Sequence, residues 1–195
     1  MCLSDPHCCV ASYSKGASTC RFDTSERCCV GTETLDEWRF IQRKSYHTCN
    51  ITLTEVAYDK PAEQSSVYSL SYSAAKAIDG SVNTYMHTNK EQSPYWIVDL
   101  GKIYQIKRIE IFNRNAGFNS TGERLRDLDI IVGPSHNEMQ ICAHYVGPAQ
   151  LGDHLLFTCG HVECARYVKL RLTGTDYLHV AEVKVYAVNE SCTSN

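Results

Sequence analysis

Apolar and polar residues alternate along most of the chain from about residue 49 onward. Apolar side chains recur with a period of two in the segments 96–100, 106–111, 128–132, 167–172 and 180–186. A period of two places one face of each segment toward a core, which is typical of β-strands. Only residues 73–78 have the spacing of a brief helical turn. The pattern therefore predicts many short strands and almost no helix.

Glycine, proline and asparagine separate these apolar segments. They stand at Asp79-Gly80, from Asn113 to Gly117, at Gly133-Pro134 and at Gly147-Pro148. Such residues favour turns, and short strands at this spacing indicate an all-β sandwich or barrel. The chain shows neither long strand-helix-strand units nor a glycine-rich phosphate-binding motif. A nucleotide-dependent enzyme is therefore not expected.

The first 48 residues have a different character. They are polar, carry 6 of the 11 cysteines, and contain only two short strand-like pieces, near residues 11–13 and 20–22. A segment with so little apolar material depends on disulfides for its stability. We therefore expect two parts, a small disulfide-rich segment at 1–48 and a β-sandwich domain at 49–195.

Composition and charge narrow the range of functions. The net charge of -3 and the scattered basic residues argue against a nucleic-acid surface. No apolar run approaches the roughly 20 residues that span a bilayer, so we expect no membrane insertion. The first ten residues lack the basic-then-apolar layout of a signal peptide, and we expect the chain to be a processed form or part of a longer protein.

The cysteines and three glycosylation sequons indicate a secreted, extracellular protein. The sequons begin at Asn50, Asn119 and Asn189. The odd cysteine count leaves at least one thiol unpaired or bonded to another chain. Cys159 and Cys164 with the intervening His161 also allow a zinc site, but a single such cluster is a weak signal.

A series of short sequence blocks, in one order, resembles the F-type lectins, the fucolectin family, over residues about 49–192. The blocks are residues 60–66 (KPAEQSS), 77–80 (AIDG), 87–88 (HT), 94–101 (PYWIVDLG), 109–114 (IEIFNR), 124–125 (RL), 166–168 (RYV) and 182–186 (EVKVY). This resemblance implies a jelly-roll β-sandwich of the discoidin-like group. It also implies loops at one end that bind L-fucose, with calcium bracing those loops.

The resemblance assigns the sugar contacts to His87, Arg114 and Arg124. A planar guanidinium can bridge two neighbouring hydroxyls of a pyranose with parallel donors, which a lysine ammonium does less well. An imidazole adds a donor or an acceptor on a short stem. Each residue alone would more often be an ordinary loop residue or surface charge, and the assignment depends on the three occurring together.

The loop after Arg114 departs from the family pattern. Ala116 stands where the family has an acid that orients the arginines, and residues 117–122 replace an adjacent Cys-Cys pair. We expect Phe118 to supply the apolar platform that the cysteines would have formed, and Tyr85 to contact the methyl group of the sugar. Asp127 is a further candidate for orienting an arginine.

The resemblance also implies a calcium site of side-chain and backbone oxygens. Asp79 and Glu182 match the two carboxylates, and Thr84 matches a hydroxyl ligand. The remaining ligands are backbone carbonyls, which are assigned to Lys76, Ser81 and Ala181. Such a set can supply the six to eight oxygens that Ca2+ prefers. In one alternative interpretation Asp79 caps a turn and Glu182 faces solvent. In another, the Lys76 ammonium occupies the vacant site.

Cysteine pairing is a further implication of the resemblance. Cys142 and Cys159 match a family disulfide. Cys49 and Cys192 bracket the domain, whose termini should lie side by side, so we expect them to join and Cys164 to be left over. The first 48 residues resemble part of an apple or PAN module through Cys8, residues 12–16 and residues 20–22.

The sequence thus leads to a calcium-dependent lectin that recognises fucosylated glycans in innate recognition or in cell or gamete adhesion. The alternative is an extracellular protein-interaction module on the same sandwich, favoured by Ala116 and the altered 117–122 loop. An enzyme is not expected, because the chain has neither paired carboxylates in a hydrolase setting nor a nucleophile motif. Single-sugar sites are weak and gain avidity from several copies, so we expect a homo-oligomer.

Overall fold

The computed structural model describes residues 52–159, 164–188 and 192 with their side chains, and only the backbone of 10–14, 19–23, 38–42 and 163. The chain divides into two compact units, Met1–Ile51 and Thr52–Asn195. In the first unit, β1 (Val10–Ser14) pairs antiparallel with β2 (Thr19–Asp23) and β3 (Trp38–Gln42). The resemblance of residues 1–48 to an apple or PAN module depends on side chains outside the described residues, and it stays a prediction.

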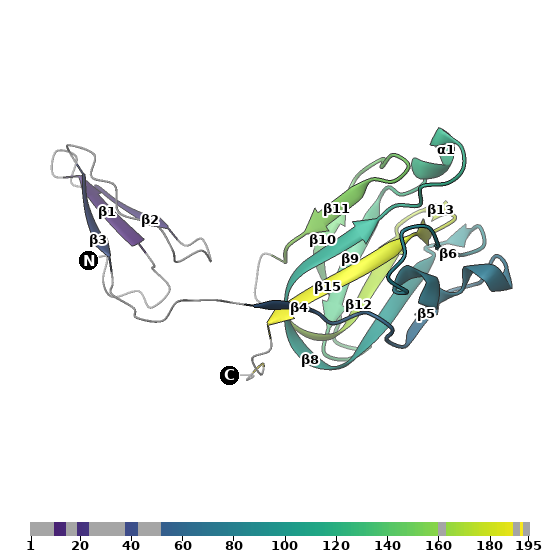
Figure 1. Ribbon diagram of the computed structural model, residues 1–195, viewed down its shortest axis with the longest axis horizontal. Helices are drawn as coiled ribbons and strands as arrows, with labels where there is room; N and C mark the ends of the chain where they lie inside the picture. Colours follow the sequence, from purple (N-terminus) through teal and green to yellow (C-terminus); the bar gives the residue numbers. More distant parts are fainter. Residues whose placement is uncertain are drawn as a thin grey trace. The chain divides into compact units, whose positions relative to one another are not determined.

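The second unit is built almost entirely of antiparallel strands (Figure 1). Its strands are β4 (Leu53–Glu55), β5 (Ala62–Gln64), β6 (Met86–His87), β7 (Glu91–Gln92), β8 (Tyr95–Phe112), β9 (Leu128–Gly133), β10 (Gln140–Tyr145), β11 (His154–Phe157), β12 (Glu163–Leu172), β13 (Thr175–Asp176), β14 (His179–Val180) and β15 (Glu182–Val188). Its helical turns are η1 (Leu70–Tyr72), η2 (Ala74–Ala77) and α1 (Asn119–Gly122). The turn expected at 73–78 corresponds to η2.

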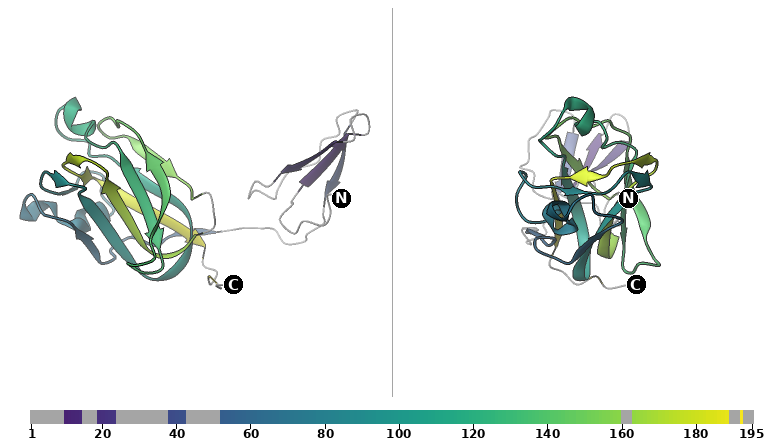
Figure 2. Two further views of the ribbon diagram at one scale, coloured as in Figure 1. Left: turned by 180° about the vertical axis from the view of Figure 1, so that it is seen from behind. Right: turned by 90° about the vertical axis from the view of Figure 1, so that its right-hand side faces the viewer.

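Strand β8 joins the two layers of the sandwich. Its first half pairs with β12 and β5, and its second half pairs with β15 and β11. β9 and β10 extend the first layer beside β12, and β4 extends the second beside β15. Figures 1 and 2 show the two layers of strands packed face to face. The expected β-sandwich fold is confirmed.

The sequence predicted two strands, at 96–100 and 106–111, where the structure has one. Residues 101–103 are exposed, and the register with β12 shifts between Ala165 and Tyr167. Gly101 has a φ of 86°, a conformation that favours glycine. The interruption is therefore a bulge that carries one strand from layer to layer, not a turn that ends it.

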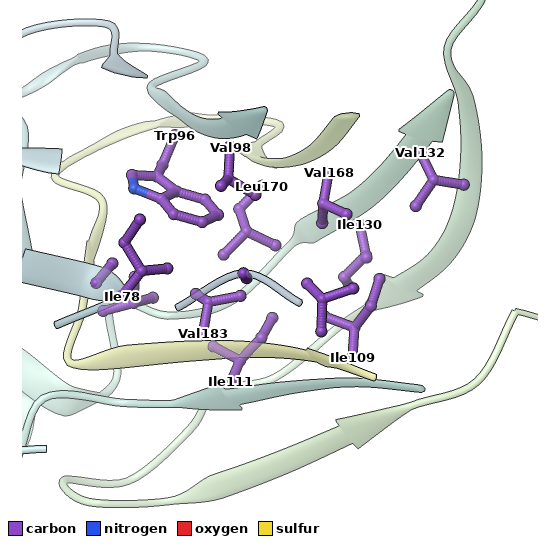
Figure 3. Packing of buried hydrophobic residues seen from close by; sticks show 14 of the residues in the cluster. Ile78, Trp96, Val98, Ile109, Ile111, Ile130, Val132, Val168, Leu170 and Val183 are labelled. Carbon is purple, nitrogen blue, oxygen red and sulfur yellow. The ribbon is translucent and has the colours of Figure 1, made fainter. Parts of the chain in front are cut away.

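The core lies between the layers. Trp96, Val98, Leu170 and Ile130 line one side, and Ile109, Ile111 and Val183 line the other (Figure 3). The Trp96 side chain is fully buried and its indole Nε1 donates to the Ala74 carbonyl at 2.9 Å. This bond attaches η2 to the core, which fixes the start of the loop that follows η2.

The described helices are all short. None of them has the length and apolar character needed to cross a bilayer.

Candidate functional site

A cavity of about 370 Å³ is lined by residues of β6, of α1 and of the segment after β13. Figure 1 shows these elements at one end of the sandwich. The cavity volume falls in the range of about 300–1,000 Å³ that is typical of small-molecule sites. The cavity is lined by Tyr68, Tyr72, Tyr85, His87, Arg114, Gly117, Phe118, Thr121, Arg124 and Tyr177. All five residues that the sequence assigned to the sugar site are among them.

His87 is held from several sides. It lies on β6 opposite His179 of β14, and its backbone carbonyl accepts from the Tyr68 amide and from the Gln64 side chain, both at 3.0 Å. The His87 Nδ1 lies 2.6 Å from the Thr88 carbonyl. In the neutral ring, Nδ1 therefore carries the proton and Nε2 is the accepting atom. Burial lowers the pKa of His87, and the Arg114 and Arg124 guanidiniums lower it further, which favours this neutral form.

Arg114 follows the end of β8 and is positioned by its neighbour Asn113. The Asn113 side chain donates to the carbonyls of Gly122 and Gln150, at 3.0 and 2.7 Å, and accepts from the Arg114 amide at 2.9 Å. These bonds tie the end of β8 to two other loops. A buried asparagine with three hydrogen bonds is a rigid support.

Aromatic groups hold the Arg114 side chain. Its guanidinium lies 4.1 Å from the centre of the Tyr85 ring, and Nη2 donates to the Tyr85 hydroxyl at 3.0 Å. Tyr85 is in turn stacked on Tyr72, with ring centres 4.8 Å apart. Tyr85 thus positions Arg114 in addition to forming part of the wall.

Arg124 reaches the cavity from the turn after α1. Gly122 makes that turn possible, because a Cβ there would lie 2.5 Å from the Leu151 amide nitrogen. The Arg124 guanidinium lies 4.8 Å from the centre of the Tyr177 ring. A cation above an aromatic face is held by attraction to the ring quadrupole. Asp127, the other candidate for orienting an arginine, does not line the cavity.

Tyr68, Tyr72 and Tyr177 complete the aromatic wall and were missed from the sequence. Their rings lie 4.8, 5.9 and 5.3 Å from that of His87. Phe118 stands at the rim with 84% of its surface exposed. The tyrosines come from segments about 100 residues apart, so local spacing carried no signal. The frequency of tyrosine, 12 in 195 residues, was the available clue.

His179 lies directly beneath His87 and is almost fully buried. Burial, and then the charge of Arg114, lower its pKa to about 3. Neither ring nitrogen has a hydrogen-bond partner in the described part of the chain. His179 is therefore a neutral group packed against His87, and it does not itself line the cavity.

Oxygen ligands gather in a second cluster, between the loop after η2 and β15. Thr84 Oγ1 donates to both carboxylate oxygens of Asp79 at 2.8 Å and lies 3.1 Å from the Ser81 carbonyl. The Gly80 amide donates to Glu182 Oε1 at 3.2 Å. Gly80 has a φ of 80°, which lets the loop turn between these oxygens.

Glu182 is the member of this cluster whose negative charge is least well compensated. Its carboxyl group is buried, and its Oε2 has no partner among the described residues. Burial raises the pKa of Glu182 to about 7, and the nearby Asp79 carboxylate contributes in the same direction. Lys76 Nζ lies 3.2 Å from Asp79 Oδ2, and the buried Ala181 donates its amide to the Phe112 carbonyl at 2.8 Å.

These residues fit a hard cation. No group of three or more His, Cys, Asp or Glu side chains suited to a metal occurs in the described ranges, so a metal would also need the hydroxyl and backbone oxygens. An orphaned carboxylate oxygen beside a second carboxylate is the arrangement that a divalent cation would relieve. The expectation that Glu182 faces solvent is wrong, and the Lys76 ammonium is at Asp79, as the alternative interpretation foresaw.

The disulfides agree with one of the two predicted pairings. Cys142 bonds Cys159, but Cys192 bonds Cys164 with a Cα–Cα distance of 5.8 Å. The predicted Cys49–Cys192 pair is therefore wrong, and Cys164 is not left over. Val188 and Cys164 flank the same β8 residue, Gln105, so the end of β15 lies close to the start of β12. Because Cys159 and Cys164 are both oxidised, neither can bind zinc as a thiolate.

Only one of the three sequons can be placed. Asn119 is exposed at the start of α1, next to the cavity rim. Asn50 and Asn189 lie outside the described residues, as does Cys49. Glycosylation at the three sites stays a prediction.

Comparison with known proteins identifies relatives of the second unit. Residues 76–170 match the family model for a NedA-like, galactose-binding domain. Fucolectin-6 of Anguilla japonica is 35% identical over 121 residues, which cover 59% of this chain and 63% of that protein. The chain thus spans less than two thirds of that relative.

Two solved structures share the fold. The lectin-binding domain of lectinolysin complexed with Lewis b is 30% identical with a TM-score of 0.60, and the match covers 70% of this chain and 98% of that domain. The fucolectin from striped bass (Morone saxatilis) serum is 27% identical with a TM-score of 0.62, covering 71% of this chain and 48% of that one. With the sandwich, the cavity and these similarities together, the chain belongs to the fucolectin family of F-type lectins.

Proposed function

We propose that the cavity binds L-fucose within fucosylated glycans. The observation that carries the proposal is the convergence of His87, Arg114 and Arg124 in one aromatic-walled cavity, in a chain of the fucolectin family. The relatives are named as lectins, and one was solved with Lewis b. Lectins bind carbohydrate without transforming it, so the function is binding and not catalysis.

The geometry suggests a role for each group. His87 Nε2 accepts a hydrogen bond from a sugar hydroxyl, because Nδ1 faces the Thr88 carbonyl. Arg114 and Arg124 donate to neighbouring ring hydroxyls with their planar forks. Tyr68 and the exposed Phe118 offer apolar surface to the methyl group and the carbon-bound face of the sugar. The two arginines come from separate loops, so binding requires the folded end of the sandwich.

We further propose that calcium braces the loop beside the cavity. The groups that would hold it are Asp79, Thr84, Glu182 and the backbone carbonyls of Lys76, Ser81 and Ala181. A bound cation would neutralise the two carboxylates and fix the loop that leads from Gly80 to Tyr85. The orphaned Glu182 oxygen supports this assignment. The Lys76 ammonium would leave Asp79 when the cation binds.

The chain is best placed outside the cell. Two disulfides in the described region support an oxidising compartment. A homo-oligomer would raise the avidity of a weak monosaccharide site. We propose a role in recognition or adhesion at glycan-coated surfaces.

Titration of the purified chain with L-fucose and with the Lewis b oligosaccharide tests the first proposal. We expect saturable binding that Arg114→Ala abolishes and that the matched Arg166→Ala retains, because Arg166 pairs with Asp99 and does not line the cavity. Folded protein that binds neither sugar would overturn the proposal. It would favour the alternative of a protein-interaction surface, which the exposed Phe118 could serve.

Thermal melting with excess CaCl2 and with chelator tests the calcium proposal. A ligand at about one hundred times its Kd stabilises by about 2.7 kcal/mol, which corresponds to a rise of roughly 5–10 °C for a domain of this size. Glu182→Gln should remove this rise, and Glu63→Gln, on the exposed face of β5, should keep it. Equal melting temperatures in calcium and chelator would sink the proposal.

A further inference from the structure

The two cavity arginines lack acidic partners among the residues that the structure describes. Neither Arg114 nor Arg124 forms an ion pair with any residue in the described part of the chain, and no carboxylate side chain lines the cavity. The Arg114 Nε is buried without a hydrogen-bond partner. The cavity therefore holds two permanent positive charges that no group among the described residues neutralises.

The charge of the two arginines lowers the pKa values of the neighbouring histidines, His87 and His179. After burial, the charges that most lower the pKa of His87 and of His179 include both Arg114 and Arg124. Both imidazoles are consequently neutral near pH 7, and the charge of the cavity comes from the guanidiniums alone. Charges of one sign in a concave, partly desolvated site concentrate ligands of the opposite sign.

The arginines also have donors to spare. Arg114 uses Nη2 for the Tyr85 hydroxyl, and a guanidinium carries five N–H donors. Nη1 of Arg114 and the fork of Arg124 remain for a ligand. Hydroxyl groups of a neutral sugar would accept some of these bonds but would leave both charges uncompensated. The planar fork matches the paired oxygens of sulfate and carboxylate.

We propose that the preferred ligand is an acidic fucosylated glycan, in which a sulfate ester or carboxylate on or next to the entering sugar meets Arg114 and Arg124. This inference depends on the proposed function and narrows its ligand class. The exposed Phe118 at the rim leaves the cavity open on that side, so a substituent on the sugar need not be buried.

Paired probes that differ only in the acidic group test the inference. For sulfate, the pair is a fucan oligosaccharide and its chemically desulfated form. For carboxylate, the pair is the 3′-sialylated Lewis x oligosaccharide and Lewis x itself. Charge-assisted bonds to the guanidiniums should strengthen binding of one acidic member about ten- to a hundredfold over its neutral partner. The gain should shrink as NaCl is raised from 50 to 500 mM.

The outcomes separate the two proposals. Tighter binding of the sulfated probe alone assigns the anion to sulfate, and tighter binding of the sialylated probe alone assigns it to carboxylate. Equal affinity within both pairs overturns the inference but leaves fucose binding in place. If no member of either pair binds the folded protein, the proposed function itself fails.

A matched pair of variants isolates the effect of charge. Phe118 lines the cavity yet is 84% exposed, so Phe118→Glu and Phe118→Gln should both fold. The two replacements have nearly the same shape and differ in one negative charge beside the arginines. We expect Phe118→Glu to lower the affinity for the acidic probe at least tenfold more than Phe118→Gln does. Both variants should change the affinity for the neutral probe by the same factor. Equal effects on the acidic probe would show that the arginines do not bind an anion.

Discussion

The arginines of the sheets and those of the cavity have opposite environments. On β12, Arg166 makes two bonds of 2.7 Å to Asp99, and Arg171 makes one of 2.8 Å to Asp129. In the cavity, Arg114 and Arg124 lie against the rings of Tyr85 and Tyr177. The sheet arginines are satisfied within the fold. The cavity arginines are held in place by aromatic groups and keep their donors for a ligand, which is typical of sites that trade stability for function.

The largest effect on stability is expected at Asp129, the buried acid that pairs with Arg171 and His144 on the sheet. Asp129 is 3% exposed and accepts bonds from both Arg171 and His144. Asp129→Ala leaves these partners unpaired, and we expect a loss of about 2–3 kcal/mol in the free energy of unfolding, measured by urea denaturation. Affinity for a fucosylated probe should not change. A parallel loss of affinity would show that sheet and cavity are coupled.

The pH dependence of stability has a definite sign at Asp129. Burial raises the pKa of its carboxyl, but the bonds from Arg171 and His144 outweigh burial and hold the pKa below its usual value. The charged form is therefore the stabilising one, and its contribution is present above pH of about 4 and lost as the pH falls below that. Asp129→Asn should flatten the stability curve in this acid range.

The cavity should respond to pH in a higher range, through His87. The groups that face its ring are Tyr68, Tyr72, Tyr85, Tyr177, His179 and the guanidiniums of Arg114 and Arg124. Burial and the two arginines lower the pKa of His87 below 6.5. Protonation removes the accepting Nε2, so affinity for neutral Lewis b should fall as the pH is lowered from 7 to 5. His87→Gln keeps an acceptor and should bind with little pH dependence, and an unchanged slope in this variant would assign the titration elsewhere.

Removing charge from the cavity should sharpen the comparison further. Arg114→Met and Arg124→Met keep much of the apolar stem and remove a cation that has no acidic partner. We expect the unliganded protein to be as stable as the wild type, or more stable by about 0.5–1 kcal/mol, in urea denaturation. Arg171→Met is the matched control and should destabilise. A loss of more than about 1 kcal/mol in the cavity variants would mean that the aromatic contacts contribute to folding.

The smallest effect on stability is expected at the more exposed pair on the sheet, Arg166 with Asp99. The Arg166 guanidinium lowers the pKa of Asp99 through its two hydrogen bonds, so the charged form of Asp99 is favoured in the fold and the pair contributes above pH of about 4. The pair faces solvent, where such bridges are weak. Asp99→Asn should lower the melting temperature at pH 7 by about 1–2 °C. At pH 2 the melting temperature should not change, because the carboxyl group is then protonated in the wild type.

The strands could be predicted from local sequence, whereas features that depend on residues far apart in the chain could not. The alternation in residues 128–132 and 180–186 predicted β9 and β15, because a period of two depends only on the nearest neighbours. The break at Gly101 was ambiguous, because a turn and a bulge both favour glycine. Its outcome depended on β12, which lies more than 60 residues further on.

The site shows the same division. The motif residues His87, Arg114 and Arg124 could be picked out because the resemblance to F-type lectins attaches roles to them. The tyrosines at 68, 72 and 177 could not, because tyrosine is common here and its role depends on which ring it faces. The pairing of Cys164 with Cys192 depended on strand order, which places Cys164 and Val188, the last residue of β15, on either side of Gln105.

The sequence by itself determined an all-β sandwich of the fucolectin family, its disulfide between Cys142 and Cys159, and the cationic residues of its site. The tertiary structure alone decided that those cations have no acidic partner among the described residues and that tyrosines from distant segments hold them. It also decided that the Glu182 carboxylate is buried with one oxygen that has no partner in that part of the chain. The reason is physical. Strand formation responds to neighbours along the chain, whereas charge compensation and burial depend on groups that only folding brings together.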